Sequence, residues 1–473
     1  MRASPNFNRL FPEATQPITP SQESGLIKLG QAMRDVQERA GQDTPKIGYT
    51  YFGQFVDHDL TQDRTLLNGP YQNPADTRNY RTGYLDLDNV YGGGPTDSGS
   101  SRLYEGPVEA ATFIIGSTPL GHPRDVHFVD GKPMIPDDGD PRDLENVMVR
   151  QIHVLLMKFH NETIRQLTAN PPLIIFPDGT QPTGGSFFDQ ARKLVTWHYQ
   201  WIVRNKYFEA ILKRDIWYKL IDRTLPITRQ TDFSIPIEFA TAAFRFGHSM
   251  VRNSYPLNCK NVDVQLTDLV ADPERPMPLA DNQIIEWGLF FLGLAASRPS
   301  TGSSFIDTSI TGALHDMPPI SLPVRALLRG ARYKIASGQQ VFEEFLRANL
   351  VTEGDRLSAD ELTRDVHNVS GTELKNANLQ DNTPLFYYIL KEAELRENDG
   401  RTLGSLGSLI IAQVIETALQ SDLESYISVF GTGWRRPSWT RPNRGRGSVE
   451  SISDIAKLVG DDELLFNCQP IGV

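Results

Sequence analysis

Residues 52–60 read FGQFVDHDL and place one histidine between two aspartates in an otherwise apolar stretch. Successive residues of a helix are about 100° apart around its axis, so Gln54 and His58 share one face, with Asp57 at its edge. Asp59 points to the opposite side. Histidine and aspartate are costly in apolar surroundings unless they are paired or bound to something. The stretch therefore predicts a helix that serves two sites, one through His58 and one through Asp59.

Two simpler interpretations of this stretch are open on its residues alone. A buried histidine beside a carboxylate is commonly a structural pair. A His-Asp doublet also binds divalent metal in metal-dependent phosphohydrolases, but that chemistry needs further histidines on neighbouring helices. His122 and His127 lie in a loop-like stretch, and His153 and His160 belong to a helix that is typical of a protein core. Other parts of the sequence must decide between these interpretations.

The composition is typical of a soluble globular protein with room for a large core. The chain has 473 residues, 39% of them hydrophobic and 22% charged, and its net charge of −11 argues against a broad nucleic-acid surface. No apolar run reaches the roughly 20 residues that span a bilayer, and the N-terminus lacks the apolar segment of a secretory signal. We expect Cys259 and Cys468 to be free thiols, and the protein to be cytoplasmic or exported by an unconventional route.

Apolar residues recur at three- and four-residue spacing along much of the chain, which predicts a mainly helical protein. The clearest helical stretches are 147–167, 186–212 and 405–420. Proline- and glycine-rich connections are predicted at 68–80, 92–101, 117–141 and 296–323, and a basic surface loop at 431–447. The sequence has no internal repeat and no clear linker. We therefore predict an N-terminal arm (1–24) and one large helical domain (25–473) with functional loops.

The stretch TGYLDLDNVY brings oxygen donors together at even spacing. Thr82, Asp86 and Asp88 offer side-chain oxygens, and the carbonyls of Thr82 and Tyr84 are also available. A hard cation such as Ca²⁺ collects six to eight oxygens from carboxylates, hydroxyls and backbone carbonyls. Asp59 would supply the remaining carboxylate from the first helix. An ordinary Asp-rich turn is the alternative on these residues alone.

Two further stretches carry candidate groups in helical settings. In GDPRDLENVMV a turn leads into a helix start, and Arg142 and Glu145 are three residues apart on one face. In AAFRFGHSMV small residues around His248 leave room for a flat cofactor, and Arg245 lies one turn earlier. A lone histidine is a common axial ligand of haem iron. Taken singly, the first pair fits a surface ion pair, and the histidine fits a core residue.

Together the four stretches resemble, in order and in spacing, the animal-type haem peroxidases of the peroxidase–cyclooxygenase superfamily, over about residues 25 to 460. The resemblance implies a single, mainly α-helical domain around a buried haem b, with Ca²⁺ as a second cofactor. The site residues it implies are Gln54, His58 and Arg142 for catalysis; His248 as the haem-iron ligand, with Arg245 beside it; Asp57 and Glu145 as carboxylates that form ester bonds to the haem; and Asp59, Thr82, Tyr84, Asp86 and Asp88 as calcium ligands.

The resemblance also implies a mechanism. His58 takes a proton from H₂O₂ and returns it to the departing oxygen as water, while Arg142 stabilises the negative charge on that oxygen. Gln54 hydrogen-bonds distal water or a small anion, and Asp59 ties the back of the helix to the calcium loop. The product is a ferryl haem that oxidises small donors.

Two positions separate the branches of the superfamily. Cyclooxygenases and fatty-acid dioxygenases carry a radical-forming tyrosine three residues before the proximal histidine, where this chain has Arg245. We therefore predict a peroxidase; a fatty-acid dioxygenase and a calcium-stabilised haem scaffold with little turnover are the alternatives. Myeloperoxidase-like members have a methionine after the second ester-forming glutamate, where this chain has Asn146. Iodide, thiocyanate, bromide and phenols are thus expected as donors rather than chloride. The lack of the disulfides of secreted animal enzymes favours a bacterial source, and the oligomeric state stays open.

One segment departs from the family pattern. The proximal histidine usually donates its second ring N–H to an asparagine in the segment Leu-x-x-Arg-Asn-Leu-Leu-Arg-Gly. Here the segment is LPVRALLRG, which keeps Arg325 and Arg329 but has Ala326 at the asparagine position. The missing hydrogen bond would have given the imidazole anionic character. We predict a higher iron reduction potential and slower peroxide activation than in members with asparagine.

Overall fold

The computed structural model describes residues 5–14, 19–41, 43–67, 71–270, 277–292, 301–317, 320–396, 399–441 and 444–462. Its α-helices are α1 (Pro20–Ala32), α2 (Ile47–Leu60), α3 (Asp88–Tyr91), α4 (Val147–Thr168), α5 (Phe187–Ile202), α6 (Phe208–Ile211), α7 (Arg214–Ile221), α8 (Ile237–Thr241), α9 (Gly312–His315), α10 (Leu322–Arg332), α11 (Gly338–Arg347), α12 (Ala359–Leu362), α13 (Ser370–Asn376), α14 (Leu385–Arg396), α15 (Ser405–Ser421), α16 (Tyr426–Phe430) and α17 (Ile452–Leu458). Three shorter turns position functional residues: η4 (Pro141–Leu144), the π-helical η5 (Val203–Tyr207) and η6 (Ala243–His248). The prediction of a mainly helical protein is confirmed.

The strands form short antiparallel ribbons. They pair as β1 (Tyr104–Glu105) with β2 (Thr112–Phe113), β3 (Ile115–Gly116) with β4 (Asp125–Val126), β5 (Phe128–Val129) with β6 (Lys132–Pro133), β7 (Ser254–Tyr255) with β8 (Val264–Gln265), and β9 (Trp439–Arg441) with β10 (Gly445–Gly447). The last ribbon corrects the prediction of a surface loop at 431–447. Trp439 is fully buried against the rings of Phe159 and His198, at centroid distances of 5.2 and 5.4 Å, and this contact holds the segment on the body.

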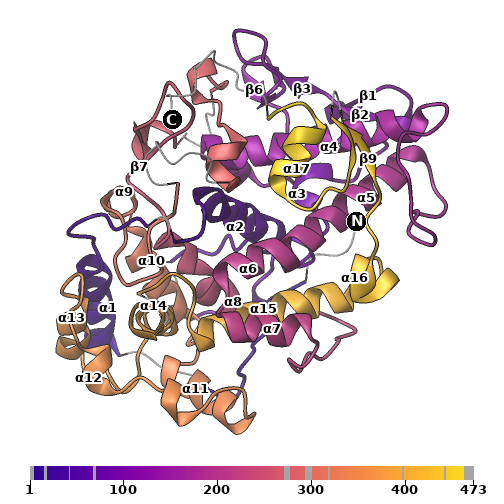
Figure 1. Cartoon of the computed structure of the whole chain (residues 1–473). Helices are drawn as coiled ribbons and strands as arrows, with labels where there is room; N and C mark the ends of the chain where they lie inside the picture. Colours follow the sequence, from indigo (N-terminus) through magenta and orange to yellow (C-terminus); the bar gives the residue numbers. More distant parts are fainter. Residues whose placement is uncertain are drawn as a thin grey trace.

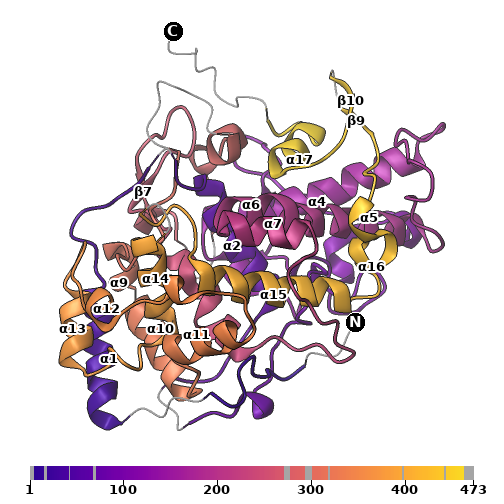
Figure 2. The same ribbon diagram turned by 60° about the horizontal axis from the view of Figure 1, so that its bottom comes forward.

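The longest helices cross the middle of the molecule, and α2 lies among them. Figure 1 shows α2, α4, α5 and α15 in this central position, with α1 and α10 to α14 gathered at one end and the ribbons β1 to β6 at the other. In Figure 2, α1 and α10 to α14 again lie together at one end. The helix α2 contacts α4, η4, η5 and η6, so every side of it meets protein. Most residues of α2 are apolar, as a helix in this position requires, and its polar side chains Gln54, Asp57, His58 and Asp59 face the two candidate sites.

Two local features shape the packing around α2. A Cβ at Gly53 would overlap the hydroxyl of Tyr207, so only glycine lets α2 approach η5 this closely. The predicted helix over 186–212 is α5, η5 and α6 in succession, with the π turn placing Tyr207 against α2. Such turns are common at functional sites.

The N-terminal segment packs on the body of the molecule. Phe7 and Phe11 are buried, and the Phe7 amide donates to the Thr77 carbonyl at 2.9 Å. The division into an arm (1–24) and a domain (25–473) stays a proposal, and its boundary falls inside α1.

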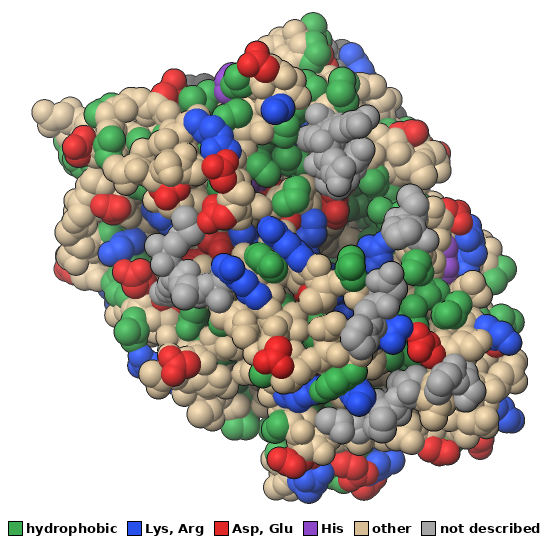
Figure 3. Space-filling model, turned by 180° about the vertical axis from the view of Figure 1, so that it is seen from behind, with side chains coloured by type: hydrophobic (Ala, Val, Ile, Leu, Met, Phe, Trp, Pro, Cys, Tyr) green, Lys and Arg blue, Asp and Glu red, His purple; other side chains and the backbone are tan. Residues whose placement is uncertain are grey.

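Acidic and basic side chains are interspersed on the face of the molecule opposite to that of Figure 1, without a large area of one sign (Figure 3). Among the described residues, no helix combines the length and apolarity that crossing a membrane requires. Cys259 is disulfide-bonded, so the prediction of a free thiol there is wrong. The sequence has one other cysteine, Cys468, which lies outside the described residues. Two cysteines 209 positions apart give no spacing pattern that predicts a bridge.

Candidate active site

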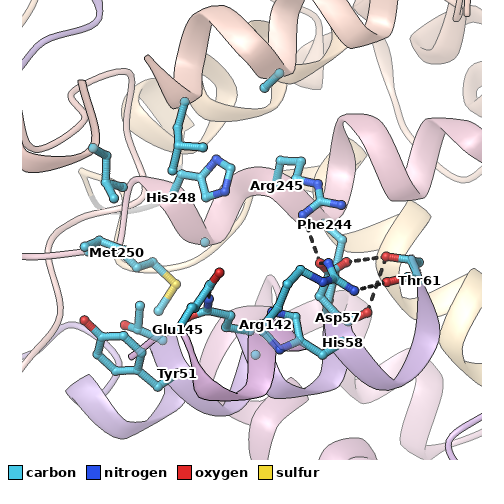
Figure 4. A pocket seen from close by; sticks show the side chains of 18 of the residues that line it. Tyr51, Asp57, His58, Thr61, Arg142, Glu145, Phe244, Arg245, His248 and Met250 are labelled. Atoms are coloured by element: carbon cyan, nitrogen blue, oxygen red, sulfur yellow. Dashed lines mark hydrogen bonds and ion pairs between the residues drawn. The ribbon is translucent and has the colours of Figure 1, made fainter. Parts of the chain in front are cut away.

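A cavity of about 330 Å³ lies between α2 and η6. His58 lines it from α2, and His248 lines the opposite wall (Figure 4). Arg142, which is in η4, and Glu145, the residue after η4, line the cavity beside them. Three of the four stretches that the sequence singled out therefore meet in one place. The rest of the lining is mixed. It includes the apolar side chains of Phe244, Met250, Val251, Leu314, Met317 and Leu322 and the charged ones of Asp63, Arg325 and Arg329.

His58 is held through one ring nitrogen and is open to the cavity at the other. Its Nδ1 lies 2.8 Å from Oδ1 of Asp143, and the residue is 2% exposed. The part of the chain that the structure describes offers Nε2 no hydrogen-bond partner. Because an ionised carboxylate can only accept, Nδ1 carries the proton. In the neutral ring, Nε2 then has the lone pair that can take a proton from a bound molecule.

Asp143 lies behind His58 and was not singled out from the sequence. Its second oxygen, Oδ2, lies 2.9 Å from Nδ1 of His153 and accepts from Nδ2 of Asn89, also at 2.9 Å. The side chain is completely buried. Burial raises the pKa of Asp143, but the hydrogen bonds from His153 and His58 outweigh this and hold the pKa well below its usual range. The expectation that His153 is a hydrogen-bonded core residue is confirmed, and its partner is the carboxylate that also holds His58.

Two arginines meet at Asp57. Arg245 Nη1 lies 2.9 Å and Arg142 Nη1 3.4 Å from Oδ2, and Thr61 donates to Oδ1 at 2.8 Å (Figure 4). Burial raises the pKa of Asp57, but Arg245 and Arg142 outweigh it, so the pKa lies below its usual value. Asp57 is thus an ionised carboxylate at the cavity wall.

Arg142 is fixed by a residue that sequence reasoning did not select. Asp140 caps η4 by accepting from the Arg142 amide at 3.0 Å, and the same carboxylate accepts from Arg142 Nε at 2.9 Å. The Thr61 carbonyl accepts from Arg142 Nη2. Burial lowers the pKa of Arg142, but Asp140 outweighs it and the net pKa is raised. The guanidinium is therefore a permanently charged group in a fixed position, and the signal for this was the N-cap residue type before Pro141.

Gln54 is engaged with protein groups at the same wall. It donates to Glu145, and its Oε1 accepts from Asn146 Nδ2 at 3.1 Å. Asn146 is also the N-cap of α4, where its side chain accepts from the Val149 amide at 2.9 Å. Asparagine is among the preferred N-cap residues, which gives a structural reason for this residue type. Burial raises the pKa of Glu145.

His248 has the properties expected of a metal-ligating histidine. Burial, reinforced by Arg245, lowers its pKa to about 3, so the ring is neutral. Its Nδ1 is buried and has no hydrogen-bond partner in the described part of the chain. Ala326 also lines the cavity. A Cβ at Gly247 would meet nothing within 4 Å, so space is open beside the ring. A neutral imidazole with open space beside it, in a cavity of mixed apolar and charged walls, fits haem iron.

A cluster of three carboxylates lies behind α2, away from the cavity. Oxygens of Asp59, Asp86 and Asp88 all lie within 4.8 Å of one another. Both oxygens of Asp59 are buried without a hydrogen-bond partner. Burial and the neighbouring carboxylates raise the pKa of Asp59 well above its usual value and that of Asp88 to about 8. Arg81 Nη1 donates to Asp88 at 3.0 Å, whereas the Asp59 oxygens have no donor in the described part of the chain. A donor-free buried carboxylate beside two further carboxylates fits a hard divalent cation.

The loop that carries Asp86 and Asp88 is built to turn tightly. Thr82 Oγ1 donates to Asp86 at 3.1 Å, and the Thr82 amide donates to Asp88 at 3.3 Å. Leu87 has a φ of 57°, a left-handed conformation that lets both aspartates face the same point. The ring of Tyr84 packs on Phe233 at 5.7 Å, which leaves only its backbone as a ligand candidate.

Comparisons with known proteins show the family of the chain. A family model described as animal haem peroxidase matches residues 63–327, which include Arg142 and His248. A peroxidase-like protein of Margaritifera margaritifera is 25% identical over 262 residues, which are 43% of this chain and 31% of that protein. Heme peroxidase 2 of Caenorhabditis elegans is 28% identical over 186 residues, 38% of this chain and 25% of that protein. The chain thus spans about a third or less of the length of these relatives.

Solved structures show the same fold. Peroxidase A from Dictyostelium discoideum has a TM-score of 0.60 at 18% identity, covering 91% of this chain and 90% of that chain. A fatty acid alpha-dioxygenase from Arabidopsis thaliana has a TM-score of 0.64 at 13% identity, covering 99% and 82%. The chain thus shares the fold of the peroxidase–cyclooxygenase superfamily, and the family match implies that it binds haem. The chain belongs to the animal haem peroxidase family.

Proposed function

We propose that this chain is a haem peroxidase that uses H₂O₂ to oxidise small donors, such as iodide, thiocyanate, bromide and phenols. The observation that carries the proposal is the placement of His58 and Arg142 on one side of a cavity and of neutral His248 on the other. His248 would hold the haem, whose iron would supply the centre for peroxide cleavage. His58 Nε2 accepts the peroxide proton and returns it to the departing oxygen. The Arg142 guanidinium, held by Asp140, stabilises the negative charge on that oxygen.

The absorption spectrum of haem-loaded protein tests this function directly. One equivalent of H₂O₂ should bleach the ferric Soret band, and iodide or a phenol should restore it. A Soret band that does not respond to peroxide contradicts the proposal and favours a haem scaffold with little turnover.

A fatty-acid dioxygenase is the second candidate, favoured by the structural likeness to the Arabidopsis thaliana enzyme. Arg245 argues against it, because this position would have to form a tyrosyl radical in that branch. The ion pair of Arg245 with Asp57 gives the arginine a different role at the cavity wall. Oxygen uptake with palmitate and without H₂O₂ would favour the dioxygenase.

We also propose that Asp57 and Glu145 form the ester bonds to haem. What supports this is their position: both carboxylates line the cavity from different elements. Asp57 is ionised, and because Arg245, Arg142 and Thr61 bond to its two oxygens, one of these bonds would have to break when the ester forms. Gln54, bonded to Glu145, would position the second carboxylate and hydrogen-bond distal water.

Calcium is proposed as the ion bound by Asp59, Asp86 and Asp88, with Thr82 and the Tyr84 carbonyl as further ligands. Chelation with EDTA should lower the melting temperature, and Ca²⁺ at about a hundredfold excess over its dissociation constant should raise the free energy of unfolding by about 3 kcal/mol. Thermal melts with and without EDTA measure this. Asp59→Asn should abolish the calcium response, whereas Asp360→Asn, at an exposed carboxylate on α12, should keep it. An equal calcium response in the two variants contradicts the site.

Ala326→Asn should restore an acceptor for the unpartnered Nδ1 of His248. A hydrogen bond from Nδ1–H makes the imidazole more anionic and stabilises ferric iron. The variant should therefore have a lower reduction potential and react faster with peroxide than the wild type. A spectroelectrochemical titration measures the potential, and Ala326→Val, which adds no acceptor, is the control. Equal potentials in both variants and the wild type would show that this position does not tune the iron.

A further inference from the structure

Among the described residues, Asp143 is the one buried carboxylate that is hydrogen-bonded both to His58, which lines the cavity, and to a second histidine, His153. It follows Arg142 in η4 and is completely buried. It accepts from three donors on three different elements: His58 on α2, His153 on α4 and Asn89 on α3. Its partners His58 and Asn89 are 85 and 54 residues away in the sequence. The contacts are thus made by the fold and not by local spacing.

The three donors determine which oxygen of the Asp143 carboxylate faces which partner. Oδ1 is directed to His58 alone, while His153 and Asn89 both bond to Oδ2. An amide Nδ2 can only donate, so Asn89 keeps Oδ2 an acceptor, and His153 must then present its own Nδ1–H. With its second oxygen held in this way, the carboxylate cannot rotate away from His58. The His58 ring is left with its proton on Nδ1 and its free lone pair on Nε2, toward the cavity.

We infer that Asp143 is the positioning residue of the distal base: it sets the tautomer and the orientation of His58, and His153 and Asn89 hold it in place. This inference rests on the proposed function, because the orientation of His58 affects the reaction only if its Nε2 takes a proton in the cavity. It also links the two sites, since Asn89 directly follows Asp88 of the carboxylate cluster. A shift of that loop would move a donor of Asp143.

A purely structural role for Asp143 predicts something different. Arg204 and Glu416 form another buried ion pair, at 2.8 Å, outside the cavity. Loss of such a pair should lower stability without changing the chemistry of each folded molecule. Loss of the Asp143 carboxylate should change how the distal side handles a proton. In Asp143→Asn the amide has one acceptor oxygen and one NH₂ group. Asn89 and His153 both donate on one side, so the oxygen belongs there, and the NH₂ group faces His58. The His58 ring must then accept through Nδ1. Its proton then moves to Nε2, and the base is lost.

Cyanide binding to the ferric haem-loaded protein separates the two roles without peroxide turnover. Hydrogen cyanide must give up its proton to bind iron as the anion, so its association rate reports the distal base. Asp143→Asn should bind cyanide at least about tenfold more slowly at equal haem content. Glu416→Gln, the matched loss of a buried carboxylate, should bind at the wild-type rate. His153→Asn, whose Nδ2 takes the place of the histidine Nδ1 and can still donate to Asp143, should stay within about threefold of it.

Three results would overturn the inference. One is a folded, haem-loaded Asp143→Asn that binds cyanide as fast as the wild type; another is an equal slowing in Glu416→Gln. If Asp143→Asn does not fold, His153→Phe and Asn89→Ala each leave the carboxylate but remove one donor that holds it. Slower cyanide binding in either supports the inference, and unchanged binding in both overturns it. A wild-type protein that takes up no haem would instead overturn the proposed function.

Discussion

His58→Ala is expected to slow the reaction of the haem-loaded protein with H₂O₂ by about 10²- to 10⁴-fold, the usual contribution of a positioned general base. The variant removes Nε2, the open nitrogen of the distal wall. Arg142 keeps its contacts with Asp140, so stabilisation of the departing oxygen should survive. The rate is measured by stopped-flow spectroscopy as the loss of the ferric Soret band, per bound haem.

The control for this variant is another buried histidine. His198 is completely buried on α5, and its Nδ1 bonds to the Leu194 carbonyl at 2.7 Å, away from the cavity. His198→Gln should react with peroxide at close to the wild-type rate. If His58→Ala retained more than about a third of the wild-type rate, proton transfer by His58 would not be part of the reaction, since even a weak general base contributes about 10²-fold.

The helices that periodicity predicted are those with long, regular apolar patterns. The stretches 147–167 and 405–420 correspond to α4 and α15 within one residue at each end. Within 186–212 the π turn was not predicted, because η5 continues the apolar spacing and differs only in its hydrogen bonds. The connections 68–80 and 296–323 lie partly outside the described residues.

The candidate site was predictable where a motif names the residue, and not where the fold alone supplies the partner. The approach of His58 to His248, and of Asp59 to Asp86, followed from the family resemblance, and the structure places them accordingly. Asp143 could not be found in this way. Spacing rules show which neighbours share a helix face, but they do not show a contact across 85 residues.

The charge states of Asp57 and Glu145, which line the cavity, could not be predicted from the sequence either. Asp57 alone does not reveal that two arginines, 85 and 188 residues away, converge on one of its oxygens. These pairs matter for function because they keep one carboxylate ionised beside the position proposed for haem, while burial raises the pKa of Glu145. The two proposed ester carboxylates therefore start from different electrostatic environments.

His248→Ala is expected to weaken haem binding by more than about 100-fold. Loss of a residue that only hydrogen-bonds to a metal-ligating histidine already lowers metal affinity by about 10- to 100-fold, and loss of the ligand itself should cost more. His248 and His58 are the two histidines in the described cavity lining. The substitution removes the neutral imidazole and leaves a space continuous with the open volume beside Gly247. Added imidazole should enter this space and restore part of the binding. Titration of haem into the apoprotein, followed at the Soret band, measures both effects.

His58→Ala is the matched control for this experiment, because it removes the histidine of the opposite wall. It should bind haem as tightly as the wild type while losing peroxide reactivity, whereas His248→Ala should lose the haem itself. The reverse pattern, with haem lost from His58→Ala and retained by His248→Ala, would invert the two assignments. Asp143, bonded to His58, would then orient the iron ligand instead of the base. The pair of variants thus decides which wall of the cavity holds iron and which handles the proton.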